Sequence, residues 1–283
     1  EKDSAREVRR SPRGHIMAAA PRKISVVVPT YNETENLAPL TKRLFAATRS
    51  AGLEADLLFA DDESPGTEAS ASIVDALREQ GYAVRMHRRR RDEGRGLSSA
   101  VLLGFSVASH DVLVCMDADL QHEPEAVPAI ARPVLDDAAD FAIGSRNVGD
   151  GGIGFDWSVT RRVVSWGATL LAAPLTCSTD PMSGFFCVRR ETLDRGKRLC
   201  NPRGFKIALE IMVRCRCRRV RDVPITFRER VAGESKLTMT QNVEYVRQLL
   251  ALYWFVYKMY LAAALAAGLA VVVVLVIVAG QSR

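Results

Sequence analysis

An acidic cluster follows an apolar stretch near the middle of the chain, in the segment LVCMDADLQHEP at residues 113–124. The apolar residues 112–116 predict a short buried strand, so Asp117 and Asp119 come directly after its end. Because side chains alternate along an extended chain, residues 117, 119 and 121 are expected to project to one side. Two carboxylates this close repel each other unless a positive charge lies between them. A hard divalent cation would remove that repulsion.

The segments around this cluster alternate apolar strands with helical patterns between Ile24 and about Phe227. Strands are predicted at 24–29, 55–61, 83–88, 111–117 and 140–146, and helices around 36–50, 67–80, 96–108, 124–137 and 158–173. Continuous apolar strands separated by helices predict an α/β domain with a mainly parallel sheet covered on both faces. Ligands of such sheets bind at the carboxyl ends of the strands, so the residues after each strand matter most.

Polar motifs stand at four of these strand ends: PTYNETEN, DDESPGT, DADLQ and GSR, in chain order. Together they place acidic and phosphate-binding groups along one edge of the sheet. The first strand is not followed by G-x-G-x-x-G or G-x-x-x-x-G-K-[ST], which argues against an ordinary dinucleotide site and against a P-loop. Gly94 and Gly96 precede a predicted helix, where they either bring the backbone close to a ligand or form a plain turn.

Basic residues outnumber acidic ones in this 283-residue chain, with a formal net charge of +6. The excess is concentrated in Arg6–Arg13, His87–Arg91 and Arg214–Arg221. Such runs suit nucleic acid, an anionic membrane surface or a phosphorylated substrate, and do not choose among them. Nucleic acid is disfavoured because no recognition motif or aromatic stacking platform accompanies the runs. The six scattered cysteines match no zinc or disulfide pattern, so we expect reduced thiols in a domain facing the cytosol.

The two ends of the chain differ from the middle. Residues 1–23 are polar and rich in arginine, and we expect them to be an extension outside the fold. Residues 261–280 contain no charged side chain, which predicts a transmembrane anchor, with a buried core helix as the alternative. Arg247 and Lys258 precede this span and only Arg283 follows it, which favours a cytosolic domain. The aromatic-rich residues 245–260 suit a helix at the membrane interface.

The ordered set of motifs resembles the inverting nucleotide-sugar glycosyltransferases of the GT-A fold, and within them the dolichyl-phosphate mannose synthases. The resemblance covers about 24–248 and rests on VVVPTYNETENL, DDESPGT, GRGLSSAVLLGF, MDADLQHEPE, GSR, RRVVSWGATLLA, DPMSGFFCVRR, GFKIALEI and GESKL. One motif departs from the family pattern D-D-x-S-P-D-G-T, because DDESPGT is one residue shorter. The resemblance implies a GT-A catalytic domain at 24–238, an interfacial helix region at 239–258 and an anchor at 259–280.

The resemblance also implies roles for individual residues. The base and ribose would be cradled by Pro29, Tyr31, Glu33, Asp61 and Asp62, with Ala118 and Lys236 also in the nucleotide-sugar site. Asp117, Asp119 and Gln121 match the family's metal and diphosphate site, where oxygen ligands suit Mg²⁺ or Mn²⁺. Arg146, Arg161 and Ser165 would hold the acceptor phosphate. Asp119, Arg146 and Arg161 are the expected catalytic residues. The helical spacing independently puts Arg161 and Ser165 on one face.

The nature of the acceptor decides which chemistry the site needs. A sugar hydroxyl would need a general base, for which Glu123 and Asp180 are the candidates. A phosphate monoester is already anionic near neutral pH and needs cations to hold it instead. Attack by such an acceptor in one displacement requires no enzyme nucleophile, so we assign none.

The resemblance implies transfer of mannose from GDP-mannose to dolichyl phosphate with inversion, at the endoplasmic reticulum membrane. The same scaffold using UDP-glucose is one alternative, and a non-catalytic, membrane-tethered subunit that binds a nucleotide sugar is another. The expected partners are GDP-mannose, dolichyl phosphate and the lipid bilayer. Nucleic acid is not expected as a partner, and the sequence leaves protein partners open.

Overall fold

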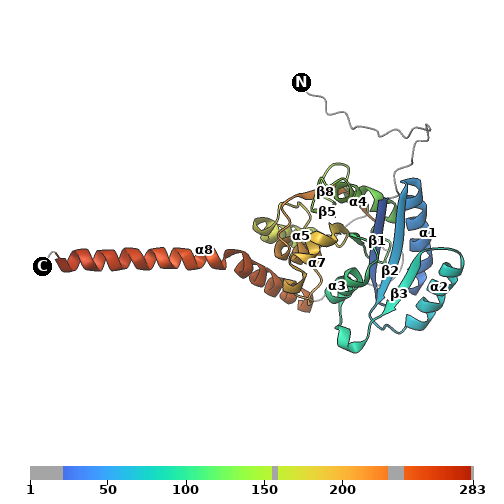
Figure 1. Cartoon of the computed structure of the whole chain (residues 1–283), viewed down its shortest axis with the longest axis horizontal. Helices are drawn as coiled ribbons and strands as arrows, with labels where there is room; N and C mark the ends of the chain where they lie inside the picture. The colour runs from blue at the N-terminus through green and yellow to red at the C-terminus, as the bar shows by residue number, and fades with distance from the viewer. Residues whose placement is uncertain (1–21, 155–158, 229–238, 282–283) are drawn as a thin grey trace, which may run out of the picture.

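A seven-stranded sheet forms the centre of the computed structural model, which describes residues 22–154, 159–228 and 239–281 (Figure 1). Its strand order is β3-β2-β1-β4-β7-β5-β8. Strand β7 is antiparallel to both of its neighbours, and the other pairs are parallel. The bounds are β1 Arg22–Thr30, β2 Leu53–Asp61, β3 Val84–Arg88, β4 Val112–Cys115, β5 Phe141–Ser145, β7 Phe186–Arg189 and β8 Val220–Pro224. A separate pair joins β6, Gly152–Ile153, to β9, Thr226–Phe227.

Helices cover both faces of the sheet (Figure 1). The bounds are α1 Thr34–Ser50, α2 Thr67–Glu79, α3 Leu97–Val107, α4 Val127–Leu135, α5 Val159–Ala172, α6 Arg190–Asp194, α7 Ile207–Arg214 and α8 Met239–Gln281, with short 3₁₀ turns η1 Arg91–Glu93, η2 Pro124–Ala126, η3 Ala173–Leu175 and η4 Lys197–Leu199. In β1, Val26 and Val28 belong to a buried cluster that includes residues of α1, α2 and α4. Val27 belongs to a second buried cluster that includes residues of α3 and α7. This two-sided burial explains why the strand is apolar throughout.

The predicted strands and helices between 24 and 173 are confirmed, with ends shifted by a few residues. The sequence did not predict β7, α6 or β8, because these elements are short and lack a clear period. The expectation of reduced cysteines agrees with six free thiols in the structure. The predicted extension at 1–23 lies almost wholly outside the described residues.

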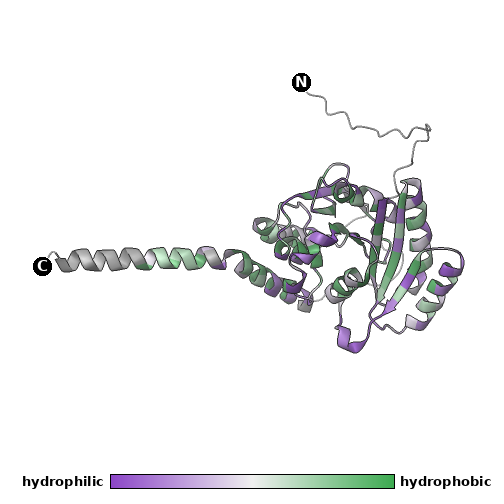
Figure 2. Ribbon diagram, viewed as in Figure 1, coloured by the Kyte–Doolittle hydropathy of each residue, from purple (hydrophilic) through white to green (hydrophobic). Residues whose placement is uncertain are grey.

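Helix α8 combines two environments. Near its start, Tyr245, Leu249 and Leu252 are buried against the domain, and the hydroxyl group of Tyr245 donates to the carbonyl oxygen of Ala168 at 2.6 Å. Farther along, the helix projects away from the domain, with hydrophobic residues along its described part (Figures 1 and 2).

Within the described residues, no single helix meets the length and hydropathy expected of a membrane span. The segments Gln241–Lys258 and Tyr260–Leu269 meet those criteria only as a pair, and they are bent by 53° relative to each other.

Candidate active site

Five strands bring their functional ends to one edge of the sheet. The chain leaves β1, β2, β4 and β5 at their carboxyl ends, which lie at one edge of the sheet because these four strands run in the same direction. Strand β7 runs the other way between β4 and β5, so its start reaches the same edge. The segment before β7, which carries Asp180 and Gly184, therefore meets the acidic cluster after β4.

The acidic cluster is held in a tight turn after β4. Leu120 has a φ of 59°, in the left-handed region, which reverses the chain between the aspartates and Gln121. The backbone N–H of Gln121 donates to Oδ1 of Asp119 at 3.1 Å, and the Asp119 residue is 7% exposed. A Cβ atom at Gly184 would lie 3.1 Å from both carboxylate oxygens of Asp117. The two carboxylates are therefore positioned before any ligand binds.

A buried histidine stabilises this turn. Nδ1 of His122 accepts a hydrogen bond from the backbone N–H of Asp117 at 3.3 Å, so that ring nitrogen carries no proton. The ring packs against Phe185 and Phe227. Burial lowers the pKa of His122 to about 4, with the charge of Asp119 acting in the opposite direction. His122 is thus a neutral structural acceptor near pH 7.

The donor set suits a divalent cation shared with a ligand. Within the described residues, no three His, Cys, Asp or Glu side chains cluster closely enough to enclose a metal. Asp117 and Asp119 offer two carboxylates, while the amide nitrogen of Gln121 donates to the carbonyl oxygen of Arg228 at 3.0 Å. Mg²⁺ is commonly bound in this way, by one or two carboxylates together with substrate phosphates and water. The residues present therefore fit a metal that completes its shell with a diphosphate.

The two aspartates after β2 make different contacts. Asp61 is buried and accepts hydrogen bonds from Thr30 at 3.2 Å and Thr67 at 2.5 Å, which ties β1 to the start of α2. Asp62 accepts from the guanidinium of Arg89 at 2.5 Å and from the backbone N–H of Gly96 at 2.8 Å. Asp61 thus holds the strand ends together, and Asp62 orders the glycine loop in front of α3.

The shortened DDESPGT loop fits closely onto the start of α1. A Cβ atom at Gly66 would lie 2.6 Å from Oγ1 of Thr34, a separation that leaves no room for a side chain. Burial lowers the pKa of Arg89 from its usual value, while the charge of Asp62 opposes that shift. The loop keeps both leading aspartates at the sheet edge despite the missing residue.

The residues after β1 lie at the same edge. Pro29 is the penultimate residue of β1 and pairs in register with Ala60 of β2. Tyr31 is 48% exposed, and Glu33 accepts a hydrogen bond from the side chain of Asn36 at 2.9 Å. An exposed ring beside a carboxylate can contact a base and a ribose hydroxyl group.

A buried ion pair joins the end of β5 to the segment before β7. Nε and Nη2 of Arg146 donate to the two carboxylate oxygens of Asp180 at 2.7 and 2.8 Å, and Asp180 is fully buried. The Arg146 guanidinium also lies 5.4 Å from the centroid of the Phe227 ring. This bidentate contact fixes the orientation of the guanidinium.

The carboxylate of each candidate general base is already in an ion pair. Asp180 is paired with Arg146 on both oxygens, and Glu123 is paired with Arg228. Hydrogen bonds from Arg146 occupy both oxygens of Asp180, and one from Arg228 occupies Oε1 of Glu123, so these oxygens are not available to a substrate hydroxyl group. The structure therefore disfavours the hydroxyl-acceptor chemistry for which these two residues were considered.

Lys206 is a site residue that sequence reasoning missed. It precedes α7, and its Nζ donates to the carbonyl oxygen of Met182 at 3.0 Å. Burial lowers the pKa of Lys206 to about 8; the charge of Arg146 acts in the same direction, and Asp117 and Asp180 oppose it. The GFKIALEI motif contained this lysine, but nothing in the sequence placed it beside the acidic cluster.

The remaining predicted residues are only partly placed. Ala118 is buried between the two aspartates, and Ser165 is partly exposed on α5. Arg161 belongs to α5 one helical turn before Ser165, but its side chain is outside what the structure describes, as is the whole of Lys236. Their proposed contacts with an acceptor stay predictions.

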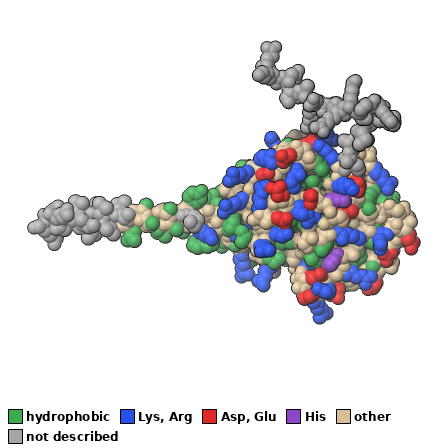
Figure 3. Space-filling model, in the orientation of Figure 1, with side chains coloured by type: hydrophobic (Ala, Val, Ile, Leu, Met, Phe, Trp, Pro, Cys, Tyr) green, Lys and Arg blue, Asp and Glu red, His purple; other side chains and the backbone are tan. Residues whose placement is uncertain are grey.

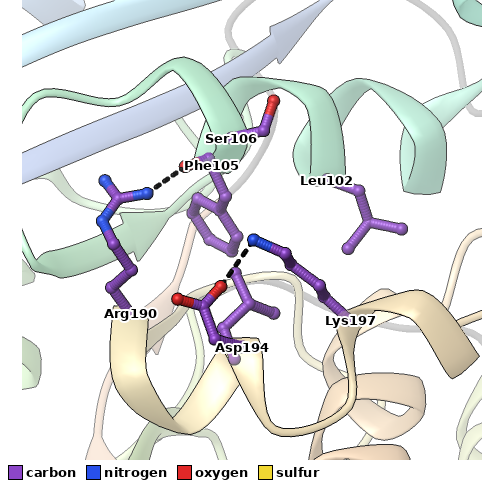
Figure 4. Close-up of a pocket in the computed structure, with 7 residues that line it drawn as sticks. Leu102, Phe105, Ser106, Arg190, Asp194 and Lys197 are labelled. Carbon is purple, nitrogen blue, oxygen red and sulfur yellow. Dashed lines mark hydrogen bonds and ion pairs between the residues drawn. The ribbon is translucent and has the colours of Figure 1, made fainter.

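One cavity lies away from this edge. Its volume is about 110 Å³, and it is enclosed between α3 and α6 by Leu102, Phe105, Ser106, Arg190, Leu193, Asp194 and Lys197 (Figure 4). Arg190 donates to the carbonyl oxygen of Phe105 at 2.9 Å and pairs with Asp111, just before β4. The cavity therefore lies near the edge of the sheet opposite to the acidic cluster.

Comparisons with known proteins agree with this geometry. Residues 25–196 match the family model described as glycosyl transferase family 2. The chain is 45% identical over 242 residues to the dolichol-phosphate mannosyltransferase of Saccharomyces cerevisiae, covering 82% of this chain and 87% of that protein. It is 39% identical over 261 residues to the protein of the same name from Mycosarcoma maydis, covering 89% of this chain and 87% of that protein. It is 42% identical over 232 residues to the dolichol-phosphate mannosyltransferase of Pyrococcus furiosus, covering 80% of this chain and 62% of that protein.

A solved structure shares the fold. Glucosyl-3-phosphoglycerate synthase from Mycobacterium tuberculosis, crystallised with Mn²⁺, UDP and glucosyl-3-phosphoglycerate, superposes with a TM-score of 0.55. The sequence identity is 22%, and the match covers 82% of this chain and 79% of that one.

Proposed function

Because the chain belongs to glycosyl transferase family 2, we propose that it transfers mannose from GDP-mannose to dolichyl phosphate and releases GDP. The observation that carries this proposal is the 45% identity, over most of both chains, to a dolichol-phosphate mannosyltransferase. The GT-A fold, with its mainly parallel sheet, supplies the edge at which donor and acceptor meet.

The acceptor is held by cations and needs no base. A phosphate monoester has a second pKa of about 6 and presents an anionic oxygen at neutral pH. Arg146, oriented by Asp180, and Lys206 supply positive charge beside the acidic cluster. Arg161 and Ser165 would extend this site along α5. Attack by the phosphate oxygen on the anomeric carbon inverts that centre in a single displacement.

The donor is held on the other side of the same edge. Tyr31 and Glu33 would contact the base and ribose, and Asp62 keeps the Gly94–Gly96 loop beside them. Mg²⁺ or Mn²⁺ held by Asp117 and Asp119 would stabilise the charge that develops on the departing diphosphate. The Mn²⁺ bound with UDP in the M. tuberculosis structure supports a divalent cation in this role.

We further propose that the protein is anchored in the endoplasmic reticulum membrane by the distal part of α8, with the catalytic domain on the cytosolic side. Support comes from residues 261–280, which contain no charged side chain. Apolar side chains are also exposed on α5 and on the first half of α8, among them Trp166 and Leu170 on the former and Leu250 and Trp254 on the latter. A dolichyl chain is confined to the bilayer, so this placement would keep the site within reach of the acceptor.

The test uses the full chain in detergent with dolichyl phosphate and labelled GDP-mannose or UDP-glucose, with and without Mg²⁺ or Mn²⁺. Metal-dependent label in the lipid fraction from GDP-mannose alone is expected. Label from UDP-glucose alone would assign the chain to glucosyl transfer, and label from neither donor would contradict the proposed activity.

A further inference from the structure

A groove lined by arginines lies on the domain outside the active site. Its volume is about 450 Å³, and its lining residues are Arg195, Leu199, Arg214, Cys215, Arg216 and Arg218. None of these residues is acidic. Most of them belong to the basic run at 214–221, for which the sequence left three classes of partner open.

The groove adjoins the first half of α8. The guanidinium carbon of Arg214 lies 4.5 Å from the centroid of the Phe255 ring. Phe255 precedes by only a few residues the bend at Lys258–Tyr260 that leads to the apolar segment. At 1.5 Å per residue, Phe255 and Leu261 are about 9 Å apart along the helix. That distance is comparable with the thickness of one headgroup layer, about 5–8 Å on each side of the hydrocarbon core.

Two of the four arginines retain unpaired charge. Arg195 is paired with Glu191 at 3.4 Å, and Arg214 with Glu210 at 3.0 Å. Arg216 and Arg218 are exposed, and their side chains have no hydrogen-bond or ion-pair partner within the described part of the chain. Figure 3 shows Lys and Arg side chains near the base of α8, next to hydrophobic side chains. The groove therefore offers net positive charge next to an apolar rim.

We propose that this groove binds the headgroups of anionic phospholipids, at the surface of the bilayer that α8 enters. The inference rests on the proposed membrane attachment of α8, but not on the identity of donor or acceptor. Leu199 is 54% exposed at the rim, which suits the glycerol backbone beneath a headgroup phosphate. Single-stranded nucleic acid is typically bound by stacking of its bases on exposed rings, whereas the ring at this groove, Phe255, is covered by Arg214.

The expected effect follows from the attraction between basic side chains and an anionic leaflet. Each Lys or Arg near such a surface contributes about fivefold in affinity, which corresponds to about 1 kcal/mol. Replacing Arg216 and Arg218 by Gln should therefore weaken binding by about 25-fold. Arg216 has a φ of 52°, and Gln meets the same backbone strain as Arg there, so the fold should be retained.

The test titrates the full chain, in a neutral detergent, with dihexanoylphosphatidylglycerol or dihexanoylphosphatidylcholine and measures binding by thermophoresis. The variants are Arg216→Gln with Arg218→Gln, and the matched control Lys42→Gln with Arg78→Gln, which removes two exposed charges from α1 and α2. Thermal unfolding checks that each variant is folded. If the double variant unfolds, Arg218→Gln alone should still weaken binding about fivefold.

Preferential binding of phosphatidylglycerol that is lost in the groove variant and kept in the control supports the proposal. Equal binding of the two lipids, or equal binding by the two variants, overturns it. So does displacement of the lipid by an equal concentration of inorganic phosphate, which would indicate a site for the free anion. Arginine-dependent binding of a short RNA without lipid binding would also overturn it. None of these readouts uses mannose transfer, and flotation with phosphatidylcholine vesicles tests membrane attachment separately.

Discussion

Individual side chains in the site are positioned by contacts made within the protein. Asp180 holds Arg146 through two hydrogen bonds, and His122 holds the backbone of Asp117. Removing one partner from a buried ion pair of this kind typically costs about 3–5 kcal/mol, because the other charge is left uncompensated. The buried charges at this edge therefore favour one arrangement of the site in advance of substrate binding.

Asp119→Ala should lower mannose transfer at least about 100-fold, because the leaving diphosphate loses a ligand to its stabilising cation. Single-turnover transfer from labelled donor measures this. Asp75→Ala, which removes an exposed carboxylate on α2, should leave transfer unchanged. Transfer by Asp119→Ala within tenfold of the unmodified protein would show that the metal role is wrong.

Activity should fall as the pH rises through about 8, because Lys206 then loses the charge that we propose helps to hold the acceptor. In Lys206→Arg the charge persists, so that limb of the pH profile should disappear. The pKa of Lys206 is lower in the folded chain than its usual 10.5, so the unfolded chain binds more protons between these values. The free energy of unfolding contributed by this lysine therefore increases as the pH rises from about 8 to 10.5. Titration of Lys206 thus does not unfold the protein in this range, and unfolding does not explain the fall in activity. An unchanged limb in Lys206→Arg would exclude Lys206 as its source.

The antiparallel strand β7 determines how the two halves of the site meet. Its insertion between β4 and β5 brings Asp180 to Arg146 and Gly184 to Asp117. A parallel strand in that position would present its carboxyl end at this edge instead. The proposed acceptor side and the proposed metal side are thus joined by one short segment.

Gly184→Ala should impair transfer while the fold is retained. The new methyl group would lie 3.1 Å from both oxygens of Asp117, closer than ordinary contact, so the carboxylate must shift. We expect roughly a tenfold loss of kcat and a higher metal requirement, since displacement of a catalytic group by about 1 Å can cost up to 100-fold. The control is Gly152→Ala, where a Cβ meets nothing within 4 Å. Normal kinetics in Gly184→Ala would contradict the tight fit.

The domain and α8 form a continuous structure in which one helix serves two environments. Its first half completes the core beside α7, and its distal half extends away from the domain (Figure 1). The region expected to form an interfacial helix, residues 239–258, includes Tyr245, Leu249 and Leu252, which are buried against the domain. In this first half of α8, Leu250 and Trp254 are exposed to solvent while Leu249 and Leu252 are buried, because the two sets of side chains lie on opposite faces of the helix.

Two truncations separate these roles. A chain ending at Tyr260 should unfold at nearly the temperature of the full chain and act on short acceptors, but lose most of its activity on long-chain dolichyl phosphate in vesicles. A chain ending at Gln241 should lose on the order of 5 kcal/mol, because Tyr245, Leu249 and Leu252 no longer bury their side chains. Thermal unfolding and transfer assays distinguish the two. Full activity on long-chain acceptors after removal of residues 261–283 would contradict the anchor.

Local patterns in the sequence were enough to predict much of the fold and of the candidate site. The apolar runs before Thr30, Asp61, Asp117 and Arg146 predicted the parallel strands and the edge at which those residues lie, because strand period and turn chemistry are properties of short segments. Only the tertiary structure showed that Asp180 is paired with Arg146, that Lys206 adjoins the acidic cluster and that β7 runs antiparallel. These facts depend on contacts between segments far apart in the chain. Side chains such as Tyr245 and Leu249 suit an interface and a core equally well by composition, so packing alone decided their place.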